Sequence, residues 1–472
     1  MKKFLFIILL LSAIVGKAQK ESTSPLPNRY QLAWHDMEYY LFMHFGPNTF
    51  DGKEWGSGKE SPDVFDPTQF DPRQWCRIAR AAGAKGIIIT AKHHDGFCLW
   101  PSKHSSYTVK ESKWRHGYGD VLRELSYACR EYGLKFGVYL SPWDKNHPDY
   151  GTDEYNDVFK DMLKEVLKNY GPVWELWLDG ANGEGPNGKK QKYDWEKFIK
   201  TVRKVSPATV IFSDIGPDIR WVGNEKGIAG DPNWNFLNTT GFSIGAEAPP
   251  PDTLLHGNYY GQEWIPAECD ISIRPSWFWK ADEDDKIKSA DELFKIYLRT
   301  VGRGANLLLN VPPDNRGMIT AKDSAALMEF KKIRRENFAV NLLKKADSYY
   351  EFSQKDFKKA PLKIRDFDST YAYYGINLQN FIVHFQKPTT LNCIALREAI
   401  HLGQTIRKFR IVLYNGPKVV SEINGTSIGH KRILTFPAVT VTSFRVYLED
   451  AKGNDNISGI AAYLIDEKFV NP

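Results

Sequence analysis

The chain has 472 residues and a formal net charge of +6, and it contains 14 Trp, 23 Tyr and 5 Cys residues. This length exceeds one average domain and suits a barrel of roughly 250 residues with a smaller partner. Its 63 basic and 57 acidic residues are interspersed, which argues against a nucleic-acid partner. The many Trp and Tyr residues in a polar chain favour a carbohydrate ligand, although most individual aromatic residues are expected in the core.

Residues 1–18 are typical of a signal peptide. Lys2 and Lys3 precede an apolar run over 4–15 that is too short to span a bilayer as a stable helix, and small residues follow up to Ala18. We therefore expect export to the periplasm or the medium. No later run of the sequence is apolar and long enough to cross a membrane, so the exported chain is not expected to be membrane-embedded.

Strand-like apolar runs alternate with amphipathic helical patterns from residue 39 to about 311. This alternation predicts a parallel sheet that closes into a (β/α)8-like TIM barrel, and we assign residues 19–345 to it. One further strand is expected around 227–240. The strand-like runs are 40–45, 86–90, 135–140, 173–178, 209–212, 267–273 and 306–311, and the helical patterns are 72–82, 121–132, 155–169, 193–205 and 321–343.

Beyond the last of these helices the pattern changes to short β-type runs with no helix between them. We interpret residues 346–472 as an antiparallel β-sandwich domain that packs against the barrel and has a structural role. The runs are 381–385, 393–397, 409–414, 433–436, 444–448 and 460–464.

Asp179 ends the apolar strand-like run 173–178 and is followed by Gly180. A charge in this position is costly unless another group pairs with it or a reaction uses it. The C-terminal ends of parallel barrel strands are also where catalytic groups lie. Asp179 is therefore the first candidate for a reactive carboxylate, although the stretch alone is equally compatible with an Asp that caps the next turn.

Polar residues follow several other strand-like runs in the same way, which predicts a pocket at one end of the barrel. They are His44, the loop pair Glu54 and Trp55, His93, His94 and Tyr139.

This ring of residues could hold a metal ion or a sugar. As neighbours on a strand, His93 and His94 would point to opposite sides and chelate one ion poorly. The chain has neither an H-x-H nor an H-E-x-x-H spacing, and its five cysteines form no C-x-x-C pair. We predict a sugar pocket without metal or organic cofactor. A metal-dependent barrel hydrolase and a catalytically silent sugar-binding protein remain as alternatives.

Five motifs resemble those of the α-L-fucosidases of glycoside hydrolase family 29. They are Met43-His-Phe-Gly46, Ala91-Lys-His-His-Asp-Gly-Phe97, Gly137-Val-Tyr139, Trp174-Glu-Leu-Trp-Leu-Asp179-Gly and Asn306-Leu-Leu-Leu-Asn-Val-Pro-Pro313. The similarity extends over the whole exported chain. The block 216–225, Gly-Pro-Asp-Ile-Arg-Trp-Val-Gly-Asn-Glu, is also similar to the subgroup that prefers branched α-1,3/1,4-fucosides.

The resemblance implies a retaining exo-glycosidase that releases terminal α-L-fucose from an oligosaccharide or glycoconjugate. Asp179 would be the nucleophile and Glu225 the general acid/base, with its pKa raised by desolvation and by Asp179. Trp277 would cover the apolar edge of the sugar, and Asp218 and Trp221 would touch the sugar to which fucose is attached. By the same matching, the fucose-binding residues would be His44, Glu54, Trp55, His93, His94 and Tyr139.

Overall fold

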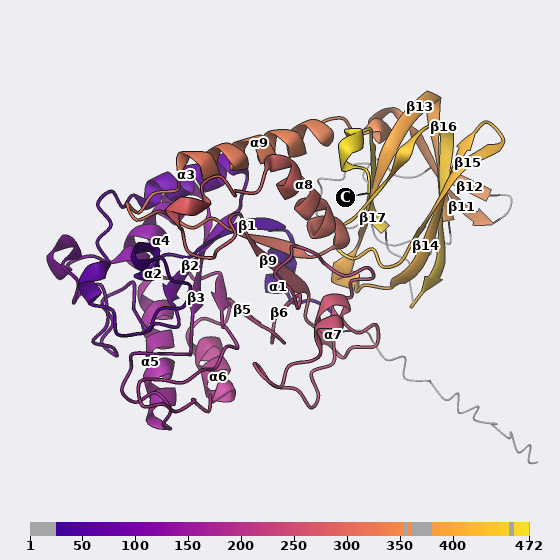
Figure 1. Ribbon diagram of the computed structural model, residues 1–472. Helices are drawn as coiled ribbons and strands as arrows, with labels where there is room; N and C mark the ends of the chain where they lie inside the picture. Colours follow the sequence, from indigo (N-terminus) through magenta and orange to yellow (C-terminus); the bar gives the residue numbers. More distant parts are fainter. Residues whose placement is uncertain (1–24, 354–355, 360–379, 453–456, 472) are drawn as a thin grey trace, which may run out of the picture.

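The computed structural model describes residues 25–353, 356–359, 380–452 and 457–471 (Figure 1). It has two parts, an α/β barrel and a C-terminal antiparallel β domain, and helix α9 (Ala321–Asn337) runs from the first toward the second. The predicted signal peptide lies outside the described residues. Within the described ranges, no helix is long and apolar enough to span a membrane.

The predicted TIM barrel is confirmed. Eight parallel strands close in the order β1-β10-β9-β6-β5-β4-β3-β2. In β1, for example, Leu41 lies beside Ile87 of β2 on one side and Leu309 of β10 on the other. The strands are β1 Tyr39–Met43, β2 Gly86–Lys92, β3 Lys135–Leu140, β4 Glu175–Trp177, β5 Val210–Ser213, β6 Ile219–Trp221, β9 Ala267–Ser272 and β10 Asn306–Asn310.

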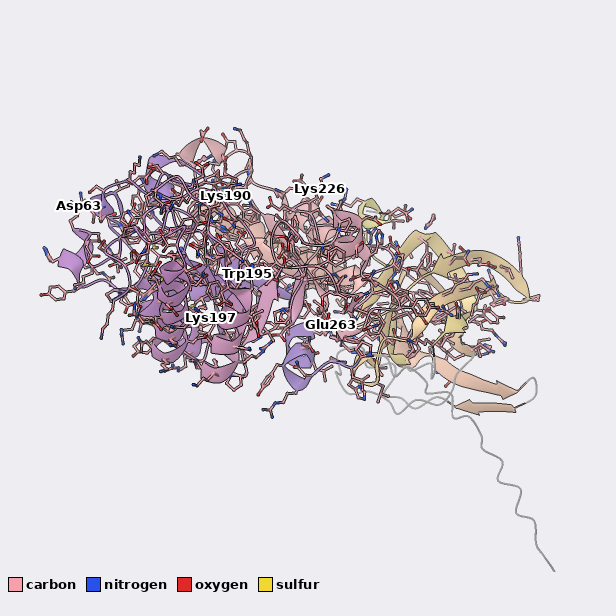
Figure 2. All side chains as sticks on the ribbon, turned by 90° about the horizontal axis from the view of Figure 1, so that it is seen from below. Asp63, Lys190, Trp195, Lys197, Lys226 and Glu263 are labelled. Atoms are coloured by element: carbon pink, nitrogen blue, oxygen red, sulfur yellow. The ribbon has the colours of Figure 1, made fainter. Side chains whose placement is uncertain are left out.

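Helices cover the outside of the barrel, and capping residues and glycines in the sequence mark where they begin and end. In α3 (Pro72–Ala82), the Asp71 side chain caps the first turn by accepting from the amide of Arg73, and Gly83 ends the helix at a φ of 80°. The remaining α-helices are α1 Arg29–His35, α2 Asn48–Asp51, α4 Val121–Tyr132, α5 Glu154–Asn169, α6 Trp195–Val205, α7 Pro251–His256 and α8 Ala290–Arg299. Figure 2 shows Trp195 and Lys197 on α6 and places Asp63 at the end of the barrel away from the β domain.

The sixth barrel strand does not lie in the predicted range 227–240. It is β6, within the block 216–225, whereas the predicted range contains only β7 (Phe236–Leu237), which pairs with β8 (Glu263–Trp264) outside the barrel. Strand β6 has only three residues and lies between Pro217 and Gly223, so it is too short to show a strand pattern in the sequence. The last helix of the barrel is also shorter than predicted, since α9 ends at Asn337.

Two buried carboxyl groups lie inside the barrel beneath the catalytic end. Glu268 accepts a hydrogen bond from the Trp177 indole nitrogen at 2.8 Å, and Glu175 accepts one from Trp34 at 3.2 Å. Burial raises the pKa of both carboxyl groups. Trp177 also stacks on Phe212 with ring centroids 3.9 Å apart. Its ring, which lines the catalytic end, is therefore held on two sides.

The C-terminal domain is an antiparallel β-sandwich around one apolar core. Two long strands bend and take part in both layers. Residues 380–391 of β13 pair with residues 439–447 of β16, whereas residues 393–398 of β13 pair with β17 and residues 432–435 of β16. The strands are β11 Asp347–Ser353, β12 Asp356–Lys359, β13 Asn380–Glu398, β14 Ile406–Asn415, β15 Lys418–Gly425, β16 Arg432–Ala451 and β17 Ile457–Tyr463.

Specific polar contacts join the sandwich to the barrel. The buried Gln404 side chain accepts from the amide of Asn235 at 2.8 Å and donates to the carbonyl of Asn233 at 3.0 Å. The Ser427 hydroxyl accepts from the amide of Asn233 at 2.9 Å. Because these contacts satisfy buried backbone groups, they define one docked arrangement of the two parts.

Candidate active site

A cavity of about 220 Å³ opens at the C-terminal ends of the barrel strands. It brings together nine of the ten side chains predicted from the sequence. These are His44, Glu54, Trp55, His93, His94, Tyr139, Asp179, Glu225 and Trp277.

Asp179 lies two residues beyond β4 and is held by three groups. One carboxylate oxygen accepts from the Tyr139 hydroxyl at 3.0 Å and lies 3.8 Å from Nε2 of His94. The other accepts from the amide of Ala181 at 2.7 Å. Its side chain remains 27 % exposed. The carboxylate is thus oriented by hydrogen bonds and open to a ligand in the cavity, as a nucleophile requires.

Glu225 lies on the rim of the same cavity, four residues after the end of β6. Although it is exposed, its pKa is raised. Desolvation by the surrounding protein is the main cause, the charges of Asp179 and Glu54 add to it, and a hydrogen bond with the Trp277 side chain opposes it. The two carboxyl groups therefore have different environments, which suits one to act as a base or nucleophile and the other as an acid.

The three histidines of the cavity are neutral near neutral pH. Burial lowers the pKa of His44 to about 3 and that of His94 to about 4, and it also holds the pKa of His93 well below its usual value. Nδ1 of His44 lies 2.9 Å from Oδ1 of Asn310, and Nδ1 of His94 lies 2.8 Å from the Ser141 hydroxyl. Neutral imidazoles held in this way can hydrogen-bond sugar hydroxyls as donors or acceptors.

The expectation that His93 and His94 point to opposite sides is wrong. Strand β2 ends at Lys92, so the alternation of a strand does not extend to the two histidines. Both rings are buried and line the cavity, with centroids 4.2 Å apart.

Two loops meet at Glu54. Its Oε2 accepts from the amide of Trp277 at 3.0 Å, and its Oε1 pairs with Lys280 at 3.2 Å. This contact joins the loop after β1 to the loop after β9. The neighbouring Trp55 is 57 % exposed and lies edge-on to His94, so it forms an apolar wall at the entrance.

A second cavity of about 330 Å³ adjoins the first and shares Asp179 and Glu225 with it. Trp221, the tenth predicted residue, lines this second cavity. Asp218 does not line either cavity. It is buried, and its carboxylate accepts from Arg203 at 2.6 Å and from the amide of Ile211 at 2.7 Å. The predicted contact of Asp218 with a ligand is therefore wrong.

Sequence reasoning missed several side chains of the two cavities. The most informative is Asp270 on β9, which lines both cavities and accepts from the Trp221 indole nitrogen at 2.8 Å. Burial, with the charge of Glu225, raises its pKa well above the usual range. In the sequence, polar residues at the alternate positions 268, 270 and 272 of an otherwise apolar strand could have predicted that Asp270 faces the inside of the barrel. The other missed side chains are Phe42, Trp177, Leu178, Ala181 and Phe212.

No group of three or more His, Cys, Asp or Glu side chains in the described part of the chain is arranged to hold a metal ion. All five cysteines are buried and free. The cavity instead combines two carboxyl groups in different environments with neutral hydrogen-bonding groups and aromatic walls, an arrangement that can bind a sugar and act on its glycosidic bond.

Comparisons with known proteins agree with this chemistry. A family model described as alpha-L-fucosidase matches residues 16–333. The chain belongs to the α-L-fucosidase family. Alpha-L-fucosidase 1 of Arabidopsis thaliana is 39 % identical over 486 aligned positions, which cover 99 % of this chain and 93 % of the relative.

Solved structures of family 29 glycoside hydrolases have the same fold. One from an unknown rumen bacterium has a TM-score of 0.84 at 38 % identity, covering 94 % of this chain and 78 % of that chain. A Ruminococcus gnavus family 29 fucosidase, solved in complex with fucose, has a TM-score of 0.83 at 29 % identity, covering 97 % of this chain and 98 % of that chain. The chain is therefore a glycoside hydrolase of the α-L-fucosidase family, as its motifs predict.

Proposed function

We propose that the protein hydrolyses terminal α-L-fucosides with retention of configuration, using Asp179 as nucleophile and Glu225 as general acid/base. The observation that carries the proposal is the setting of Asp179. It lies at the end of β4, is oriented by Tyr139 and Ala181, and shares its cavity with a second carboxyl group whose pKa is raised.

The reaction has two steps. In the first, an oxygen of Asp179 forms a bond to the anomeric carbon of fucose while the glycosidic bond breaks, and Glu225 gives its proton to the leaving oxygen. In the second, Glu225 takes a proton from water as that water attacks the anomeric carbon, and Asp179 is released as carboxylate. A retaining enzyme needs the two carboxyl groups about 5 Å apart, and we expect this separation with substrate bound.

The other cavity residues suit a monosaccharide. His44, His93 and His94 are neutral and can bind hydroxyl groups, while Trp277 can cover an apolar face of the ring. Glu54 positions the backbone at Trp277. The cavity volume of about 220 Å³ is small, which fits removal of one terminal sugar rather than internal cleavage.

Replacement of the nucleophile tests the proposal. Asp179→Ala should lower kcat about a thousandfold or more, because covalent catalysis is lost. Release of fucose from a Lewis-type trisaccharide and from an aryl fucoside would be measured. Asp252→Ala is the matched control, since Asp252 is an exposed carboxylate on α7. Near-normal activity of Asp179→Ala would show that the nucleophile is another residue.

The stereochemical outcome is tested separately. The first fucose released should be the α anomer, which ¹H NMR can record before mutarotation. Initial appearance of the β anomer would overturn the retaining mechanism while leaving the fucosidase activity in place.

For linkage, we propose a preference for α-1,3/1,4-fucosides on branched glycans. The second cavity supports this, since it adjoins the reacting carboxyl groups and offers Trp221 to a neighbouring sugar. Binding energy from that sugar can raise kcat as well as affinity. The branched trisaccharide should therefore have a higher kcat/KM than an α-1,2-linked disaccharide, and Trp221→Ala should reduce this difference. Equal kcat/KM values would overturn the preference.

We also propose that residues 1–18 direct export, on the basis of their basic, apolar and small-residue segments. Sequencing the N-terminus of the protein from its native cell should identify a chain that begins after Ala18. An intact N-terminus would overturn this proposal.

A further inference from the structure

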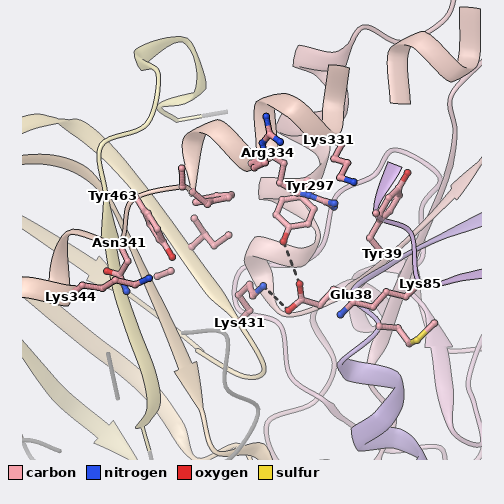
Figure 3. Close-up of a pocket in the computed structure, with 17 residues that line it drawn as sticks. Glu38, Tyr39, Lys85, Tyr297, Lys331, Arg334, Asn341, Lys344, Lys431 and Tyr463 are labelled. Carbon is pink, nitrogen blue, oxygen red and sulfur yellow. Dashed lines mark hydrogen bonds and ion pairs between the residues drawn. The ribbon is translucent and has the colours of Figure 1, made fainter. Parts of the chain in front are cut away.

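A further cavity lies at the opposite end of the barrel from the active site. It measures about 380 Å³ and is lined by Glu38 and Tyr39 at the start of β1, by Lys85 just before β2, and by residues of α9 and the sandwich. Figure 3 shows Lys344, Asn341 and Tyr463 on the sandwich side and Glu38 and Lys85 on the barrel side, with Lys331 and Arg334 on α9. The cavity is thus separate from the catalytic residues, which follow the C-terminal strand ends.

The lining of this cavity is strongly basic. Glu38 is its one acidic residue, against six cationic side chains, Lys85, Lys331, Arg334, Arg335, Lys344 and Lys431. Cations gathered around a concave space repel one another and raise the local concentration of anions.

Glu38 does not neutralise this excess, because other groups already engage its carboxylate. Lys431 and Arg397 pair with it at 2.6 and 3.0 Å, and the Tyr297 hydroxyl donates to it at 3.4 Å. The ion pairs of the described residues include no carboxylate partner for Lys331, Arg335 or Lys344. These charges are therefore available to a ligand.

Helix α9 contributes a cationic face where a domain junction would ordinarily be apolar. Lys331, Arg334, Arg335 and Phe338 all line the cavity and follow the spacing i, i+3, i+4, i+7 of one helix face. Like charges at this spacing are mutually destabilising. Cations near a helix C-terminus do favour the helix dipole, but this does not explain why Lys85 and Lys344, from two other elements, meet them.

Aromatic rings and the size of the cavity indicate what kind of anion fits. Tyr297, Tyr463 and Phe338 line the space beside the cations, and such rings pack on the C–H faces of sugars. A volume of about 380 Å³ lies within the usual range for small organic ligands and exceeds the need of a bare phosphate or sulfate ion.

We propose that this cavity binds an anionic sugar unit, a single ring that carries a phosphate, sulfate or carboxylate group, with Lys331, Arg335 and Lys344 on the anion and the aromatic rings beside the sugar. The same chemistry occurs in a free sugar phosphate and in an acidic unit of a glycan. Because the site contacts both the barrel and the sandwich, its ligand stabilises their docking. The site does not depend on the proposed fucosidase mechanism.

Calorimetric titration of the full chain tests the proposal with glucose 6-phosphate, glucose 6-sulfate and glucuronate as probes, and with neutral glucose and inorganic phosphate as references. At least one anionic sugar should bind, glucose should not, and added NaCl should weaken binding. Strongest binding of glucose 6-phosphate would indicate a free sugar phosphate, and strongest binding of the sulfate or glucuronate an acidic glycan unit. If inorganic phosphate bound at least as tightly as each of the anionic sugars, the assignment of a sugar ligand would be overturned.

Variants locate the binding. Lys331→Gln/Arg335→Gln should weaken it about tenfold, since two exposed charge contacts are lost, and should leave fucose release unchanged. The matched control is Lys322→Gln/Lys332→Gln, which removes two exposed cations from the same helix that pair with Asp285 and Glu329 outside the cavity. The proposal would be overturned if Lys331→Gln/Arg335→Gln bound the anionic sugar as tightly as the wild type, or if the control variant lost as much affinity. It would also be overturned if the wild type bound no anionic sugar.

Discussion

Two carboxyl groups in one cavity, Asp179 and Glu225, differ in what surrounds them. Asp179 receives hydrogen bonds from Tyr139 and Ala181, which fix the orientation of its side chain. Glu225 lies on the rim, where desolvation and the charges of Asp179 and Glu54 raise its pKa. The division of roles between nucleophile and acid therefore follows from local environment rather than from residue type.

Replacement of Glu225 should affect substrates unequally. Glu225→Gln should lower kcat/KM on a natural glycan about a hundredfold or more, and much less on an aryl fucoside, because only a poor leaving group needs protonation. Steady-state kinetics on both substrates would measure this, with Glu196→Gln, at an exposed residue of α6, as the control. Equal losses on both substrates would assign the acid/base role to another residue, of which Asp270 is the first candidate.

Removal of a neighbouring charge should shift the pH profile. Glu225 acts as an acid only when protonated, so kcat/KM falls as pH rises through its pKa. The charge of Glu54 is one of the causes that raise that pKa. Glu54→Gln should therefore move the alkaline limb of the profile to lower pH, whatever happens to the maximal rate. An unmoved alkaline limb, or one at higher pH, would contradict this electrostatic assignment.

At the scale of elements, the end of β4 depends on a close backbone contact. A Cβ on Gly180 would lie 2.8 Å from Oδ2 of Asp214 and 2.9 Å from Cα of Gly245. The amide of Gly245, at a φ of 92°, donates to the same Asp214 oxygen at 2.8 Å. The strand ends of β4 and β5 and the loop around residue 245 are thus packed together beside the second cavity.

A methyl group at this contact should disturb both stability and catalysis. Gly180→Ala should destabilise the protein by about 1–3 kcal/mol, because neighbouring backbone must move, and should reduce kcat since Asp179 is adjacent. Gly188→Ala is the control: Gly188 also lies in a loop, and its positive φ of 74° makes the substitution costly, yet its Cβ would meet open space. If Gly180→Ala kept full kcat, the contact would not position the nucleophile. Thermal unfolding and kinetics measure the two effects.

At the scale of the whole molecule, the barrel has a site at each end. The catalytic cavity lies at the C-terminal strand ends, and the cationic cavity lies at the N-terminal ends against the sandwich. Glu38 joins the two parts there through Lys431 and Arg397, although its own backbone is in the left-handed region at a φ of 55°. A non-glycine residue keeps such a conformation only where its surroundings hold it.

Loss of this junction should be visible in stability. Burial raises the pKa of Glu38, but the charge of Lys431, a hydrogen bond with His430 and the charge of Arg397 outweigh it and hold the pKa well below its usual 4.5. The ionised Glu38 therefore stabilises the folded protein above about pH 4.5, and this stabilisation is lost as the pH falls through the pKa of Glu38 in the folded state. Glu38→Gln should cost about 3–5 kcal/mol at neutral pH, and its Tm should approach that of the wild type in acid. A Tm difference that grows in acid would contradict this sign.

The sequence by itself determined the family, the barrel with its following sandwich, and nine of the side chains that line the catalytic cavity. Long apolar strands repeat with helices between them, and residues such as His44 and Asp179 follow those strands directly. The C-terminal ends of parallel strands lie at one end of a barrel, so position along the chain is enough to predict that these residues meet.

Tertiary structure decided what depends on the direction of a side chain or on the meeting of distant elements. The three residues of β6 acquire their place only by pairing with β5 and β9. His93 and His94 share the cavity because β2 ends at Lys92, and Asp218 turns to Arg203 instead of a ligand. The cationic cavity arises where side chains of β1, α9 and the sandwich are packed together, and packing between segments far apart in sequence leaves no local pattern to read.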